Sequence, residues 1–204
     1  MTSKLQSIFT LPILTSLLLT GCGGGDDSDQ AKAPLIPPLA QTEVVIGPAS
    51  QGAQMKWPDR STINGGAGKT LDGVGCLLNE DYHIHAHLTI IYNGETLRIP
   101  KNIGLTGCAY ELHTHDWSGV LHVETDRQKQ FTLGQFYSVW GMPLSRKNVA
   151  YLQSDEIRFF RVNNGRVAEY LDDPVLMPIT AGESIIIVIG PLPPTLPRYT
   201  WSGQ

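Results

Sequence analysis

The feature that most constrains the fold is the segment YHIHAHLTIIYNG, residues 82–94. Apolar side chains occupy every second position of its first eleven residues. Three of the positions between them are histidines: His83, His85 and His87. This period of two predicts a strand with one buried face and one histidine-bearing face. Asn93 and Gly94 then predict a two-residue hairpin turn, which returns the chain through residues 95–100.

The second half of the chain alternates or runs apolar between turn residues. Further strands are expected at residues 109–115, 120–125, 157–162, 166–171 and 184–190. The last of them, SIIIVIG, lacks polar alternation and is expected to be central and covered on both faces. Thr132 and Gln135 have the spacing of a capping box, which predicts a short helix over residues 133–140 ended by Gly141. About seven strands and one short helix indicate a mainly β fold, an antiparallel sandwich or open barrel.

Residues 1–21 have the pattern of an export signal. One early cation, Lys4, precedes the apolar run IFTLPILTSLLL, which is too short to span a bilayer comfortably. The sequence LTGC that ends at Cys22 resembles the bacterial lipobox, and this resemblance implies a lipoprotein held in the membrane by a lipid on Cys22. Gly23 follows in place of Asp, so resemblance to Gram-negative sorting favours the outer membrane, on its periplasmic or surface face.

Composition suggests the domain boundaries. Residues 22–70 are rich in Gly, Asp and Pro, which predicts a flexible tether with a short edge strand at residues 42–46. Four prolines beyond residue 190 are expected to end the regular structure, so residues 192–204 are interpreted as a Pro-rich tail. The domain proper is then residues 71–191. A net charge of −4 and the lack of a basic run argue against nucleic acid as a partner, and no protein partner is indicated.

The cysteines fit an oxidising compartment. If Cys22 carries lipid, Cys76 and Cys108 remain as a pair, which predicts a disulfide. In the chain-entropy model such a bridge stabilises a fold by roughly 3 kcal/mol. The alternative is that both cysteines are thiolate ligands, which would favour copper or zinc.

All six histidines fall within residues 83–122. Because side chains two apart on a strand share a face, three rows are expected: His83, His85 and His87; Glu111, His113 and His115; and Val120, His122 and Glu124. If the rows face one way, ring nitrogens converge at about 2.0–2.1 Å from one ion, as in zinc ligation. Imidazole also suits copper, nickel and iron, so the metal stays open, with zinc or copper favoured. Glu111 and Glu124 are candidates either to accept hydrogen bonds from the ligand rings and so fix their tautomer, or to be direct ligands.

An isolated strand histidine is usually a partly exposed surface residue, and an ordinary solvent-facing strand is the alternative for each one. The concentration of all six favours a metal site. The motifs HIHAHL, ELHTHDW and VLHVE, within residues 71–190, resemble a His-rich extracytoplasmic domain of exported or membrane-attached prokaryotic proteins, and this resemblance names no activity. The favoured function is therefore a membrane-anchored metal-binding lipoprotein. The alternatives are a hydrolytic or redox enzyme with three histidine ligands and an open position, or a structural or interaction module.

Overall fold

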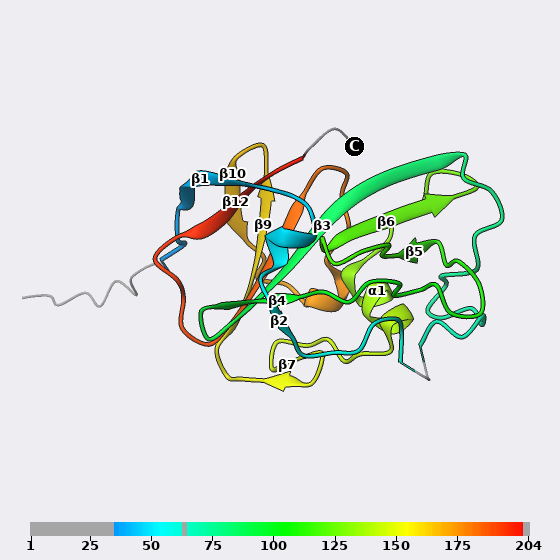
Figure 1. Cartoon of the computed structure of the whole chain (residues 1–204), viewed down its shortest axis with the longest axis horizontal. Coiled ribbons are helices and arrows are strands. Elements are labelled where there is room, and N and C mark those ends of the chain that lie inside the picture. Colours follow the sequence, from blue (N-terminus) through cyan, green and yellow to red (C-terminus); the bar gives the residue numbers. More distant parts are fainter. Residues whose placement is uncertain (1–34, 63–64, 202–204) are drawn as a thin grey trace, which may run out of the picture. The chain divides into compact units, whose positions relative to one another are not determined.

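The computed structural model describes residues 35–62 and 65–201, and from Leu35 onward they belong to one compact unit (Figure 1). The expected signal peptide and Cys22 lie outside the described residues. In chain order the strands are β1 (Leu39–Val45), β2 (Gln54–Met55), β3 (Tyr82–Tyr92), β4 (Glu95–Arg98), β5 (Leu112–His113), β6 (Val120–Thr125), β7 (Asn148–Val149), β8 (Leu152–Gln153), β9 (Ile157–Asn163), β10 (Arg166–Glu169), β11 (Ser184–Ile189) and β12 (Leu196–Thr200). The helices are α1 (Leu133–Trp140) and two short 3₁₀ turns, η1 (Pro48–Gln51) and η2 (Pro174–Leu176).

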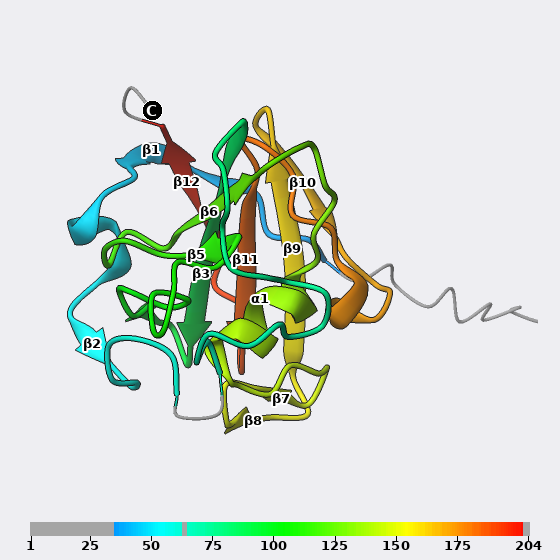
Figure 2. The same ribbon diagram turned by 90° about the vertical axis from the view of Figure 1, so that its right-hand side faces the viewer.

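The main sheet is built around β3. One edge of β3 pairs in parallel with β11, and the sheet continues through β9 to β10. The other edge has two antiparallel partners in turn, β6 along the first half of β3 and β4 along its end. β5 extends the sheet beyond β6 (Figure 2). The histidine-bearing half of β3 therefore lies beside β6, and β6 lies beside β5.

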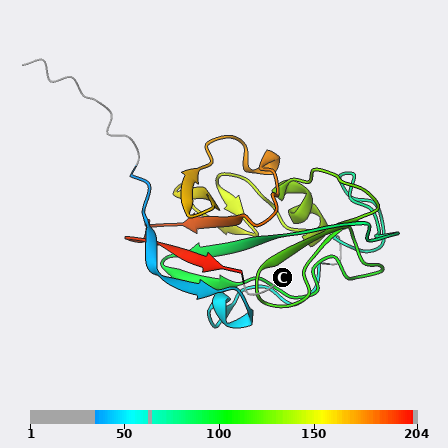
Figure 3. The same ribbon diagram turned by 90° about the horizontal axis from the view of Figure 1, so that it is seen from above.

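The two faces of this sheet pack against different layers. One face carries Leu88 and Ile187, which pack in the large core with Phe136 and Trp140 of α1. The opposite face carries a smaller apolar cluster, which includes Ile186 of β11 and Leu196 of β12. β1 and β12 pair in parallel as a separate two-stranded ribbon over that second face (Figure 3). The fold is thus mainly β and sandwich-like, as the sequence predicted.

Several local predictions are confirmed in detail. The hairpin turns after β3 and β9 have positive φ at both central residues, 50° at Asn93 and 85° at Gly94, then 49° at Asn164 and 72° at Gly165. Such turns twist the chain in the sense that antiparallel strands need. The capping box at Thr132 opens α1, and left-handed Gly141 ends it. β11 is central between β9 and β3 and buried throughout, as its unbroken apolar run indicated.

The structure differs from expectation at the ends of the domain. Residues 39–45 and 196–200 form β1 and β12, so the compact unit extends beyond residues 71–191 at both ends. The prolines beyond residue 190 do not end the regular structure, because Pro197 lies within β12. A strand in a two-stranded ribbon has one free edge, where a residue without an N–H is tolerated. The strand expected at residues 109–115 is reduced to Leu112–His113.

Candidate metal centre

Strand register brings the histidines together. His85 of β3 is the cross-strand partner of His122 of β6, and His122 is in turn the partner of His113 of β5. His83 pairs in the same way with Glu124. Directly opposed side chains on one face lie about 4.5–5.5 Å apart at Cβ, so these rings must meet. Some members of each of the three rows inferred from spacing thus meet on one face of the sheet.

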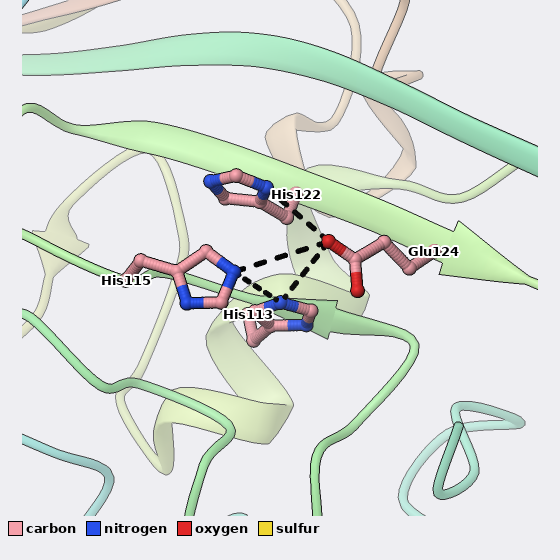
Figure 4. A group of neighbouring side chains, drawn as sticks. All are labelled: His113, His115, His122 and Glu124. Carbon is pink, nitrogen blue, oxygen red and sulfur yellow. Dashed lines mark hydrogen bonds and ion pairs between the residues drawn. The ribbon is translucent and has the colours of Figure 1, made fainter. Parts of the chain in front are cut away.

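Four of these residues form the first ligand group, here called the four-residue set: His113, His115, His122 and Glu124 (Figure 4). The Oε1 atom of Glu124 lies 3.4 Å from Nδ1 of His122, 3.5 Å from Nε2 of His113 and 3.9 Å from Nε2 of His115. The two Nε2 atoms of His113 and His115 are 3.2 Å apart. Ligand atoms around a tetrahedral zinc, each at about 2.0–2.1 Å, are roughly 3.3 Å from one another. These four distances are therefore close to what one ion requires, and all four ligand atoms lie within 4.8 Å of one another.

A second group, the three-histidine set, consists of His83, His85 and His122. Nδ1 of His122 lies 3.0 Å from Nε2 of His85 and 3.4 Å from Nε2 of His83. The same nitrogen of His122 therefore faces both sets. Glu124 Oε1 also lies 3.3 Å from Nε2 of His83, so the carboxylate borders both sets as well.

In two of the rings, the nitrogen that points away from the ligand sets makes a hydrogen bond, and this bond fixes which nitrogen faces the sets. Nδ1 of His113 lies 2.7 Å from the carbonyl oxygen of Tyr110. A carbonyl only accepts, so this nitrogen must carry the proton, which leaves the lone pair of Nε2 directed toward the four-residue set. Nδ1 of His83 lies 2.7 Å from Oε1 of Glu80, which orients that ring in the same way. Such outer acceptors are typical of histidines that bind metals.

The surroundings of three of the rings favour their neutral form. Burial, and then the neighbouring histidines, push the pKa of His122 far below its ordinary value. Burial is also the main cause that lowers the pKa of His85 and of His113. A neutral imidazole presents one lone pair on its unprotonated nitrogen. Several such lone pairs that converge beside a carboxylate form a site suited to a cation.

His87 lies outside both sets. It shares the face of β3 with His83 and His85, but its side chain is fully buried. Its Nε2 is 3.0 Å from the carbonyl oxygen of Ser118 and 2.9 Å from the amide nitrogen of Gln51, and the ring of Tyr199 on β12 packs against it. Burial lowers the pKa of His87 to about 4. The residue is a neutral core histidine in this structure.

Glu111 also lies apart from the ligand sets. Its carboxylate pairs with the ammonium group of Lys129 and accepts a hydrogen bond from the backbone N–H of Gly75. Cys76 and Cys108 form a disulfide, so they are not thiolate ligands. Backbone N–H groups of Leu77 and Glu111 reach across to the carbonyls of Ala109 and Gly75, and with the disulfide they fasten the segment that leads into β5.

Two residues near the centre carry no clear signal in the sequence. Glu80 precedes β3 and is exposed, yet it orients His83. Trp201 follows β12, and its ring lies nearly parallel to that of His85 with centroids 6.5 Å apart. Trp201, Gly182, His83 and His85 border an open cavity of about 450 Å³. Only the packing of β12 onto the sheet brings Trp201 there, and periodicity does not report such long-range packing.

Among the described residues, no helix is both long and apolar enough to cross a membrane. Comparison with protein-family models, curated proteins and solved structures finds no match for this chain. What the structure itself shows is a mainly β unit in which five histidines and two glutamates, Glu80 and Glu124, form overlapping groups that could hold a metal ion.

Proposed function

We propose that this protein binds a transition-metal ion at its histidine cluster and is held in the bacterial cell envelope by a lipid on Cys22. The observation that carries the proposal is the convergence on Glu124 Oε1 of nitrogens from His113, His115 and His122, at 3.4–3.9 Å. Three imidazole rings around one carboxylate oxygen place four metal-binding groups at one point on the sheet. One divalent ion would satisfy all four groups together.

The donor atoms favour zinc or copper. The sets offer imidazole nitrogens and one carboxylate oxygen, and the cysteines are committed to the disulfide. Hard ions such as magnesium and calcium prefer oxygen ligands, whereas imidazole suits zinc and the later transition metals. Zinc and copper are therefore the ions to test first.

The location rests on the N-terminal sequence. LTGC at the end of an export-like segment supports lipidation of Cys22, and Gly23 supports an outer-membrane destination. The disulfide supports a compartment outside the cytoplasm, because thiols stay reduced inside it. A Cys22→Ala variant should lose labelling by a radioactive fatty acid and move from the membrane to the soluble fraction. Labelling that persists in the variant would contradict this assignment.

Metal content is the decisive measurement for the site. The full chain, extracted from membranes without an affinity tag, should carry zinc or copper in a stoichiometric amount. A His113→Gln, His122→Gln double variant should lose that metal, whereas Glu111→Gln should retain it because Glu111 belongs to neither set. A wild-type protein that neither carries nor takes up either ion would overturn the proposal.

One observation favours catalysis as a second candidate. His83 and His85 of the three-histidine set border the cavity beside Trp201. Three protein ligands with an open position are the arrangement of catalytic zinc sites. There the metal would acidify a bound water for attack on an ester or a related acyl group. Zinc-dependent hydrolysis of a chromogenic ester, abolished by His85→Gln and retained in Glu111→Gln, would support this candidate. Activity that survives in the His85→Gln variant would exclude catalysis at this set.

A further inference from the structure

We infer that the metal centre holds one ion at a time, that the four-residue set is its resting position, and that the three-histidine set is its route of entry and exit. The ion concerned is a divalent transition metal, zinc or copper. This inference rests on the proposed metal binding and adds a direction of movement. Its central feature is that both ligand sets use His122.

The sharing of His122 prevents the four-residue set and the three-histidine set from being filled at the same time. Its Nδ1 lies 3.0 Å from Nε2 of His85 in one set and 3.4 Å from Oε1 of Glu124 in the other. A ring nitrogen has one lone pair and can bind one metal. Both sets therefore cannot bind metal at the same time. An ion that moves to one set must leave the ligands that belong only to the other.

The two sets differ in charge and burial. The four-residue set includes the carboxylate of Glu124, 9% exposed, and the ring of His113, 1% exposed, whereas the ring of His115 in the same set is 54% exposed. A negative ligand with little solvent around it attracts a divalent cation more strongly than neutral imidazoles do. The three-histidine set has no carboxylate and lies at the open cavity beside Trp201. The first set is thus the tighter position and the second is the one that opens toward solvent at that cavity.

The distance between the two positions is short enough for ligand exchange. Glu124 Oε1 lies 3.3 Å from Nε2 of His83, as close as it lies to the ligands of its own set. His85 and His122 are direct cross-strand partners. An ion bound to His122 and Glu124 can therefore exchange His113 and His115 for His83 and His85 one ligand at a time. No rearrangement of the sheet is needed.

This route has a kinetic signature. A path of entry and exit speeds loading and release alike, so its removal slows both and leaves the dissociation constant nearly unchanged. Loss of a resting ligand instead weakens binding. Loss of a residue that only hydrogen-bonds to a ligand lowers metal affinity roughly 10- to 100-fold, and loss of a direct ligand should lower it at least as much.

The test uses the full-length protein with zinc, measured first for stoichiometry and then by stopped-flow loading and by release to an excess of chelator. The variants are His83→Gln with His85→Gln for the route, and His113→Gln for the resting position. His87→Gln is the matched control, because it makes the same substitution on the same face of β3 outside both sets. Thermal unfolding of each metal-free variant verifies that it folds.

We expect one zinc per chain, slower loading and release in the double variant at an almost unchanged dissociation constant, and weaker binding in His113→Gln. Two tightly bound ions per chain would overturn the inference. Unchanged rates in the double variant would overturn it too, since they would mean that the ion passes directly by the exposed side chain of His115. A double variant that loses affinity as strongly as His113→Gln would show a single site with no separate route. All of these outcomes require a wild-type protein that binds zinc, so they are distinct from failure of the proposed function.

Discussion

His85 of β3 and His122 of β6 lie directly opposite each other, with Nε2 of the first 3.0 Å from Nδ1 of the second. The antiparallel register of the two strands fixes this contact. The register of β6 with β5 adds His113 to the same line across the sheet. The ligand groups are thus carried largely by paired backbone, which holds them more rigidly than a loop would.

The carboxylate of Glu124 should contribute strongly to affinity. Glu124→Gln keeps the size of the side chain and removes its charge, so zinc affinity should fall by at least about 10-fold. Glu111→Gln is the matched control, because Glu111 is also buried but pairs with Lys129. Calorimetric titration of both variants checks this. Equal affinities in the two variants would mean that Glu124 is not a ligand.

Metal should stabilise the fold in a pH-dependent way. A ligand at 100 times its dissociation constant raises the free energy of unfolding by about 2.7 kcal/mol if it binds only the folded state. Zinc should therefore raise Tm near neutral pH. Because burial lowers the pKa of His85, His113 and His122, the shift should shrink only in acid, below the ordinary histidine range, where these imidazoles take up protons. Magnesium at the same concentration should have no such effect. Thermal scans at several pH values provide the measurement, and a pH-independent shift would contradict ligation by histidine.

The metal-free protein should lose stability in acid through His87. The pKa of His87 is about 4 in the folded state, against about 6.5 in the unfolded chain. Between these values the unfolded state binds more protons, so the free energy of unfolding rises with pH. The contribution of neutral His87 to the free energy of unfolding is fully present above about pH 6.5, and it is lost as the pH falls through about 4. At about 1.4 kcal/mol per pKa unit, it amounts to roughly 3 kcal/mol.

Urea unfolding across this pH window, in the presence of a chelator, tests the role of His87. His87→Gln should flatten the pH dependence by roughly the amount stated, because glutamine does not titrate. The lowered pKa values of His85, His113 and His122 act in the same direction and should remain in the variant. A pH profile identical to that of the wild type would show that His87 is not the titrating group.

Loss of the disulfide should weaken both the fold and the site. The bridge between Cys76 and Cys108 spans a sequence separation of 32, and its removal should cost roughly 3.7 kcal/mol in the chain-entropy model. The fastened segment includes Tyr110, whose carbonyl orients His113. A Cys76→Ser, Cys108→Ser variant should therefore show a lower Tm and also a weaker zinc affinity. Unchanged zinc affinity in a folded variant would show that the disulfide does not contribute to the metal site.

Local patterns in the sequence predicted local structure well. The alternation around His85, the turn at Asn93 and the capping box at Thr132 each depend on neighbouring residues, and each appears in the structure. The disulfide was also predicted, because only two cysteines were left to pair.

Contacts between distant segments were not predictable in the same way. By periodicity His87 is equivalent to His85, and only Tyr199 and Gln51, from far along the chain, distinguish it by covering its ring. By spacing, Glu111 falls in the row of His113. In the structure the strand covers only Leu112–His113, and the carboxylate of Glu111 pairs with Lys129 away from the ligand sets. Alternation determines which side chains share a face of one strand. It does not determine what packs onto that face.

The ribbon of β1 and β12 has a consequence for the order in which the protein matures. β12 pairs with a strand made more than a hundred residues earlier, and Tyr199 and Trp201 bring it against His87 and His85. Contacts over such long separations form late, because loop closure must come first. The histidine face of the sheet is therefore expected to stay uncovered until the last described strand has been made. The cover over His87 and the wall beside His85 would then be the last parts of this face to form.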